Sequence, residues 1–218
     1  MRIISYLLSI STLLVILTII SCKEDTPKPI VTVEFKPGVE GMDAYISSYP
    51  NNNYTNRNFG DHPEFQASAW TAGEPFVVRS LIKFNLESIP PSSSVKNAML
   101  YLYSVDNTVN GPGHSTLSGS NAWKLQQVAA GWSESTVTWN TQPAITVTNS
   151  IDLPASMATI QDYQIDVTAF VANMVKNPST NHGLLLRLAD ETIYRRILFA
   201  SSDHPDSSKH PKLVVTYQ

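Results

Sequence analysis

Residues 78–86, with the sequence VRSLIKFNL, show the pattern that decides the fold. Every second side chain of this stretch is apolar or small, whereas Arg79 and Lys83 fall on the intervening positions. Because the side chains of a β-strand point alternately to its two faces, the pattern predicts a strand with one buried face. The same alternation recurs in residues 98–103 and 212–217. The chain is therefore expected to consist mainly of short antiparallel strands.

Turn-forming Pro, Gly and Asn separate about ten such segments, which predicts an all-β fold. We expect a two-sheet antiparallel β-sandwich of the jelly-roll type. A single stretch departs from the two-residue period, because its apolar side chains recur with the spacing of one buried helical face. Asp166 precedes this stretch as an N-cap, and Asn177 and Pro178 stop it. It predicts one short peripheral helix, whose buried residues are Val167, Phe170, Val171, Met174 and Val175.

The N-terminus has the features of a secretory signal. Arg2 precedes an uncharged, apolar run at 3–21, and the run ends in Ile-Ile-Ser-Cys at 19–22. This ending resembles the bacterial lipobox, which implies cleavage before Cys22 and acylation of its thiol and its new amino group. The alternative is an uncleaved transmembrane anchor, because a run of about 19 apolar residues can just span a bilayer. Both alternatives place the remaining chain outside the membrane.

The residues after the cysteine indicate a tether. Lys-Glu-Asp at 23–25 resembles the charged tract that directs some Gram-negative lipoproteins to the outer cell surface, and a solvated spacer is the alternative. Pro27 and Pro29 are incompatible with a helix. We expect an outer-membrane lipoprotein that faces the cell surface or the periplasm and contacts the membrane through its lipid. The predicted division is a signal peptide at 1–21, the lipidated cysteine and tether at 22–40, and the β-sandwich domain at 41–218.

Composition and motifs argue against two other classes of protein. The net charge is −3, and no run of Lys and Arg or cluster of Cys and His indicates nucleic-acid binding. His-Glu-x-x-His, Gly-x-Ser-x-Gly and phosphate-binding Gly-rich motifs are absent, so neither an enzyme nor a cofactor is predicted. The enzymatic alternative is a jelly-roll polysaccharide lyase, which often places Gln-Ile-His on a strand. Here Gln-Ile-Asp stands at 164–166, and aspartate cannot act as a neutral imidazole.

Alternation also places several cations and tyrosines on the strand faces opposite the core. If their strands are neighbours in one sheet, these side chains form a shared platform for a sugar. Aromatic rings stack on the apolar face of a pyranose, and arginine pairs in a bidentate way with carboxylate or sulfate. The alternative is that they are ordinary solvated positions. The candidate carbohydrate-binding residues are Arg79, Lys83, Tyr101, Tyr103, Arg187 and Arg196.

Two further groups of residues have more than one interpretation. Trp132 and Trp139 lie seven positions apart around Val137, and we interpret them as the packed ends of a structured loop rather than as sugar platforms. A second group offers the oxygen ligands that calcium prefers, although Asn and Asp also form turns without any metal. Its members are Asp43, Asn51, Asn53 and Asp61.

Three sequence blocks resemble a known family. RSLIKFNL at 79–86, WSESTVTWN at 132–140 followed by Gln142 and Pro143, and the closing block PKLVVTY at 211–217 resemble DNRLRE-domain proteins, also called family 96 carbohydrate-binding modules. The tryptophan block is the most specific of the three. The stretch DETIYRR at 190–196 departs from the sequence that gives the family its name.

The resemblance implies a β-sandwich that binds polysaccharide. Members of the family are fused to, or encoded beside, polysaccharide-degrading enzymes, and binding to alginate-like acidic polysaccharide is attributed to some of them. The expected function is therefore non-catalytic binding of a polysaccharide, including acidic glycans, by an exported lipoprotein. Its expected partners are the glycan itself and the enzymes or importers of glycan utilisation. A structural or adhesive module without a sugar site is the alternative.

Overall fold

The computed structural model describes residues 28–38, 41–106 and 109–218, with the backbone alone at 147 and 148. The predicted signal peptide and Cys22 lie outside the described residues. Within these ranges, no helix has the length and apolar character needed to cross a membrane.

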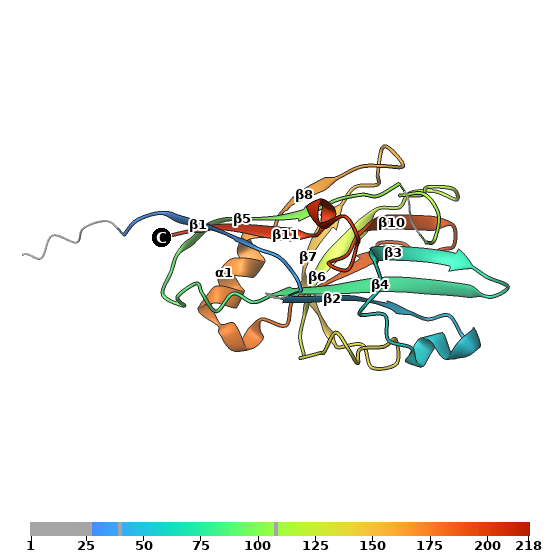
Figure 1. Ribbon diagram of the computed structural model, residues 1–218, viewed down its shortest axis with the longest axis horizontal. Helices are drawn as coiled ribbons and strands as arrows, with labels where there is room; N and C mark the ends of the chain where they lie inside the picture. Colours follow the sequence, from blue (N-terminus) through green and yellow to red (C-terminus); the bar gives the residue numbers. More distant parts are fainter. Residues whose placement is uncertain (1–27, 39–40, 107–108) are drawn as a thin grey trace, which may run out of the picture.

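Two antiparallel sheets face each other and confirm the predicted β-sandwich (Figure 1). The smaller sheet consists, in order, of β1 (Val31–Phe35), β11 (Lys212–Tyr217), β5 (Val95–Leu102) and β8 (Tyr163–Asp166). The larger sheet consists, in order, of β10 (Arg195–Ala200), β3 (Glu64–Thr71), β4 (Pro75–Phe84), β9 (Leu184–Leu188), β6 (Trp123–Val128) and β7 (Ile145–Leu153), and β2 (Gly41–Ser47) pairs with β4.

Alternation at 30–35 predicts an opening strand within the range 22–40, and the structure has this strand. Residues 31–35 form β1 and pair with β11 from Val31↔Tyr217 to Phe35↔Leu213. The C-terminal strand β11 therefore lies inside the smaller sheet, between β1 and β5. Its place ties the two ends of the described chain together.

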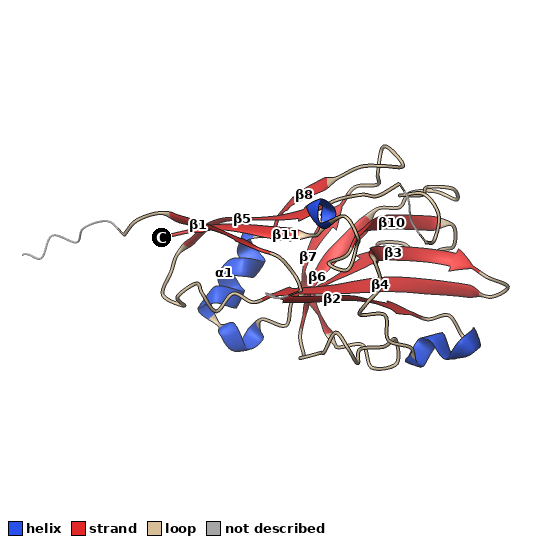
Figure 2. Ribbon diagram, in the orientation of Figure 1, coloured by secondary structure: helices blue, strands red, loops and turns tan. Residues whose placement is uncertain are grey.

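The apolar faces of both sheets meet in one core. Leu100 of β5, Leu125 of β6 and Phe199 of β10 are all fully buried in it, as alternation requires. The predicted helix is α1 (Thr168–Lys176), which packs against β5 at one end of the sandwich (Figure 2). Its buried side chains are the predicted ones, Phe170, Val171, Met174 and Val175, and Val167 before it is also buried.

Helical turns and caps complete the fold. Short 3-10 helices lie at η1 (Asn51–Asn56), η2 (Pro178–Thr180) and η3 (Ser207–Lys209). The predicted N-cap of α1 is wrong by one residue, because Val167 occupies that position. Asp166 still accepts a hydrogen bond from the backbone N of Thr168 at 2.9 Å, so its carboxylate satisfies one free N–H of the first turn.

The hairpin of β3 and β4 opens away from its turn. The two strands pair only from Thr71↔Pro75 to Ser68↔Val78. Beyond that point the Ser80 hydroxyl replaces the ladder: it accepts from the backbone N of Gln66 at 2.8 Å and donates to the carbonyl of Gln66 at 2.7 Å. Here β3 leaves β4 and continues its pairing with β10.

Candidate functional site

The aromatic cleft is a cavity of about 230 Å³ between β2, β3, β4 and the segment around η1. Five aromatic side chains line it, and small or polar side chains fill the rest of its wall. The sequence reasoning missed this cleft, because its walls come from strands and loops that are far apart in the sequence. Its lining residues are Tyr45, Ser47, Tyr49, Tyr54, Gln66, Ser68, Trp70, Ala72, Phe76, Val78, Asn110 and Arg196.

Contacts among the rings hold one wall of the aromatic cleft. Tyr49 packs edge-on against Tyr54 and Phe76, with ring centroids 5.4 Å and 5.3 Å apart, and its hydroxyl donates to the carbonyl of Ala72 at 2.8 Å. Tyr54 reaches the cleft because two residues of η1, Asn52 and Asn53, adopt left-handed φ angles of 55° and 57°. Asparagine tolerates this conformation better than most residues. The wall is thus preorganised for a flat, apolar ligand surface.

The other wall carries Trp70 and the predicted site residue Arg196. The Trp70 ring packs edge-on against Tyr194 at 5.2 Å, and the Arg196 guanidinium lies 5.6 Å from the Trp70 ring. Arg196 is only 7% exposed. Three of its nitrogens donate to the backbone carbonyls of Gly113 at 2.9 Å, Asn110 at 2.6 Å and Pro112 at 2.8 Å. Burial lowers the pKa of this guanidinium.

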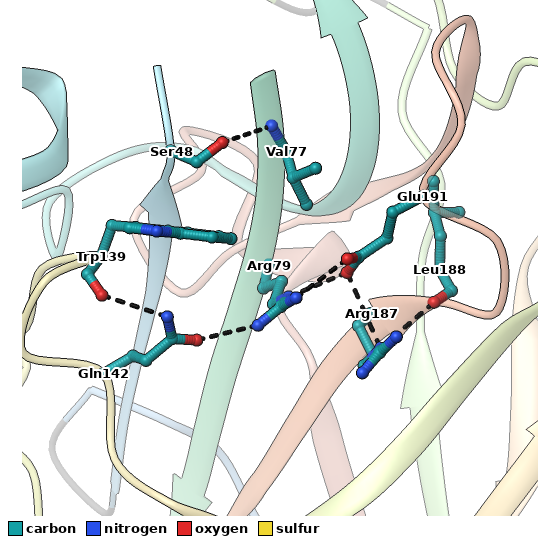
Figure 3. Close-up of polar contacts among 8 residues, drawn as sticks. All are labelled: Ser48, Val77, Arg79, Trp139, Gln142, Arg187, Leu188 and Glu191. Atoms are coloured by element: carbon teal, nitrogen blue, oxygen red, sulfur yellow. Dashed lines mark hydrogen bonds and ion pairs between the residues drawn. The ribbon is translucent and has the colours of Figure 1, made fainter. Parts of the chain in front are cut away.

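Arg79 and Arg187 lie on the opposite face of the larger sheet, around one carboxylate (Figure 3). Arg79 donates through Nε and Nη2 to the two oxygens of Glu191, both at 2.8 Å, and through Nη1 to Gln142 at 3.0 Å. Its guanidinium lies 4.8 Å from the Trp139 ring. The Nε of Arg187 is 3.7 Å from the same carboxylate of Glu191. The Arg79 guanidinium is therefore largely used inside the protein.

The six predicted residues do not form one platform. Lys83 shares a strand face with Arg79, but Leu81 between them is fully buried in the cluster that contains Val137. Tyr101 and Tyr103 belong to the smaller sheet or follow it, because β5 pairs with β11 and β8 rather than with β4. Lys212 and Lys209 lie over these two tyrosine rings, at 5.1 Å and 5.8 Å. A sugar-binding role for any of the six stays a prediction.

A cation that the sequence reasoning missed lies beside Arg187. Lys124 of β6 stands directly opposite Arg187 of β9, and its ammonium donates to Asp152 of β7 at 2.6 Å. Because Lys124 alternates with the buried Trp123 and Leu125, the sequence indicates that it lies on the strand face opposite the core. The pairing of β6 with β9 cannot be read from the sequence. Like charges directly opposite each other destabilise a sheet unless something compensates them.

The carboxylate of Asp43 meets two acidic side chains other than those expected. Ligand atoms of Asp43, Glu134 and Asp203 lie within 4.8 Å of one another, an arrangement that can hold a metal ion. Asp43 is 1% exposed and accepts from the backbone N of Ser202 at 2.9 Å. Burial raises the pKa of Asp43 to about 6. Of the expected calcium group, Asn51 and Asn53 lie exposed in η1, where Asn53 accepts from Asn56 at 2.7 Å.

The sequence blocks that suggested a family pack against each other. Arg79 from the first block contacts Trp139 and Gln142 from the second, as Figure 3 shows. Trp132 Nε1 donates to the carbonyl of His182 at 2.8 Å, so both tryptophans hold the loop on the sheet, as interpreted from the sequence. The model of carbohydrate-binding module family 96 matches residues 38–217. The chain belongs to carbohydrate-binding module family 96. A search of curated proteins found no match.

Membership of family 96 shows that the domain is a carbohydrate-binding module. Such modules are generally non-catalytic. The family-96 blocks themselves do not line the aromatic cleft, since none of the cleft residues falls within them. In this family-96 chain, the blocks stabilise the sandwich, and the cleft has the shape and chemistry of a ligand site.

Proposed function

We propose that the protein is a non-catalytic polysaccharide-binding module that holds sugar rings in the aromatic cleft. The supporting observation is the grouping of five aromatic side chains with serine, glutamine and asparagine in one cavity. Binding sites for small organic groups are usually concave and mostly apolar, with a few polar groups that fix orientation. A pyranose has an apolar C–H face and a hydroxyl rim, and the cleft complements both.

Each part of the cleft has a distinct role in this proposal. Trp70 and Tyr54 offer ring faces or edges to the C–H surface of the sugar, which buries apolar area on both partners. Ser47 and Ser68 offer hydroxyl groups that donate to and accept from the sugar rim. Because no reacting atom has to be activated, no acid or base is required.

Affinity electrophoresis in gels that contain single polysaccharides tests the proposal. Trp70→Ala is expected to weaken retardation by the bound polysaccharide about tenfold or more. The matched control is Tyr101→Ala, which removes an aromatic ring from the smaller sheet. Equal retardation of wild type and Trp70→Ala would count against the cleft, and a loss in Tyr101→Ala would favour the smaller sheet instead. Retardation by no polysaccharide would favour the structural or adhesive alternative.

Acidic polysaccharide is the ligand class implied by the resemblance, and the pair of Arg187 and Lys124 supports it as a second contact, on the face of the larger sheet opposite the aromatic cleft. Arg187 lies 3.7 Å from Glu191 and donates to the carbonyl of Leu188 at 3.3 Å, and Lys124 pairs with Asp152 at 2.6 Å. A carboxylate or sulfate between Arg187 and Lys124 relieves the repulsion of their charges. Lys124→Gln is expected to weaken binding to alginate and to make the affinity for alginate less dependent on salt concentration. Binding to neutral dextran should be unchanged. Lys83→Gln is the control, and equal effects of both changes refute this part.

Display on a membrane through Cys22 belongs to the same proposal. The lipobox-like ending at 19–22 supports it, and a module held at the outer membrane would concentrate glycan near enzymes or importers. Growth with a palmitate analogue is expected to label the wild-type protein but not Cys22→Ala. Labelling that survives in Cys22→Ala rules out this anchor, and unlabelled membrane-bound protein favours an uncleaved segment.

A further inference from the structure

We infer that Asn110 recognises a hydroxyl group of the sugar in the aromatic cleft, and that Glu64 and Arg196 are positioning residues that hold Asn110 in place. The inference rests on the proposed function. Asn110 is one of the cleft residues. Its backbone N donates to Glu64 Oε1 at 3.1 Å, its Nδ2 donates to Glu64 Oε2, and its carbonyl accepts from Arg196 Nη1 at 2.6 Å.

These contacts orient the Asn110 amide. Glu64 is 2% exposed, and both of its carboxylate oxygens accept from Asn110. The amide cannot turn over, since that would bring its oxygen against the oxygen of Glu64. Glu64 uses one of the two Nδ2 hydrogens and orients the amide, so that Oδ1 can accept from a sugar hydroxyl and the second Nδ2 hydrogen can donate to the same hydroxyl. A sugar hydroxyl can donate to Oδ1, whereas a carboxylate cannot.

Arg196 fixes the loop that carries Asn110. Its guanidinium bridges the carbonyls of Asn110, Pro112 and Gly113, and its own backbone N and O pair with Ser115 at 2.9 Å each. Both ends of this loop segment are thus tied to one strand residue. The planar fork of arginine can reach three carbonyls at once, which the single nitrogen of lysine cannot do. Arg196, which the sequence suggested as a direct contact for carboxylate, acts through Asn110 instead.

Titration of the protein with methyl glycosides of glucose, galactose and mannose, followed by NMR, tests the inference. For a glycoside that binds, one monodeoxy derivative is expected to bind the wild type about 3- to 10-fold more weakly, the effect of a single neutral hydrogen bond. Asn110→Ala should weaken binding of the parent glycoside by the same factor, and it should bind the parent and that derivative equally well. Asn97→Ala, an exposed asparagine of β5, is the control.

Two variants test the positioning residues. Glu64→Gln lets the Asn110 amide turn over, so the hydroxyl preference should disappear while Trp70 still contributes to binding. Arg196→Lys keeps the charge but loses the planar fork, so it should give the same loss together with faster hydrogen exchange in residues 109–113. If Asn110→Ala keeps the wild-type preference among deoxy derivatives, the inference is wrong even where Trp70→Ala abolishes binding. If the wild type binds none of the glycosides while Trp70→Ala still weakens retardation by a polysaccharide, this inference is refuted and the cleft proposal stands; if Trp70→Ala also changes nothing, both are refuted.

Discussion

Replacing Arg79 should reduce the stability of the protein rather than its affinity for glycan. Arg79→Met keeps the aliphatic stem that packs on the sheet but removes the guanidinium, with its bidentate pair to Glu191 and its bond to Gln142. The side chains of Arg79 and Glu191 are 20% and 19% exposed, so the pair lies between the surface and the interior.

The expected loss follows from that intermediate burial. Removing one partner of a fully buried pair costs about 3–5 kcal/mol, because the other charge is left without compensation. Exposed pairs contribute about 0–1 kcal/mol. Glu191 keeps a contact at 3.7 Å with Arg187, which compensates part of its charge. We therefore expect Arg79→Met to cost about 2 kcal/mol, which corresponds to a melting temperature lower by about 4–8 °C in a domain of this size.

A double-mutant cycle with Glu191→Gln measures the pair itself. Urea unfolding of the two single variants and the double variant should give a coupling free energy of about 1–2 kcal/mol. Lys36→Met is the matched control, because the contact of Lys36 with Glu34 is 3.6 Å long and half-exposed, and it should cost less than about 1 kcal/mol. Coupling near zero, or a loss of glycan binding without a loss of stability, refutes the structural role of Arg79.

Three other perturbations follow from the same structure. Gly183 has φ +84° and a Cβ there would lie 2.2 Å from the carbonyl oxygen of Ile82, so Gly183→Ala should cost about 2–3 kcal/mol in urea unfolding. Burial raises the pKa of Asp43 to about 6. The wild type should therefore lose stability as pH rises from about 4 to 6, because Asp43 ionises more readily in the unfolded chain. Asp43→Asn lacks this titration, so between pH 4 and 7 its stability should improve relative to wild type by up to about 3 kcal/mol. Burial lowers the pKa of His114, whose Nδ1 accepts from the backbone N of Leu198 at 3.0 Å. The unfolded chain therefore takes up a proton at His114 more readily than the folded protein. In thermal unfolding, the wild type should lose stability relative to His114→Gln as pH falls below 6.5.

The sequence was sufficient for the fold because burial follows local periodicity. Ile82 and Phe84 of the opening stretch are buried as alternation predicts, and the helical spacing identified Phe170 and Met174. The boundaries were less certain. Residues 31–35 alternate like a strand yet were grouped with the tether, and only their pairing with β11 attaches them to the domain.

The candidate site was less predictable, because alternation gives a strand face but not the neighbours of the strand. Tyr101 lies in the sheet opposite Arg79, although both were placed on outward faces. Arg196 does lie on the strand face opposite the core, as alternation predicts. Its three carbonyl partners, however, come from a loop more than 80 positions earlier in the chain. Trp70 stands opposite Phe76 in the paired part of β3 and β4, but the cleft is completed by Tyr54 and Asn110, whose positions in loops alternation does not give.

Two groups of residues have different physical roles: one group identifies the family, and the other lines the cleft. Arg79, Trp139 and Gln142 bind one another and fix a loop to the outer face, where any change costs stability. Trp70 and Asn110 lie outside the family blocks and line the cleft, where a change is expected to alter which sugar fits. A module with the same blocks but a different side chain at position 110 should therefore keep this fold and prefer another arrangement of hydroxyl groups.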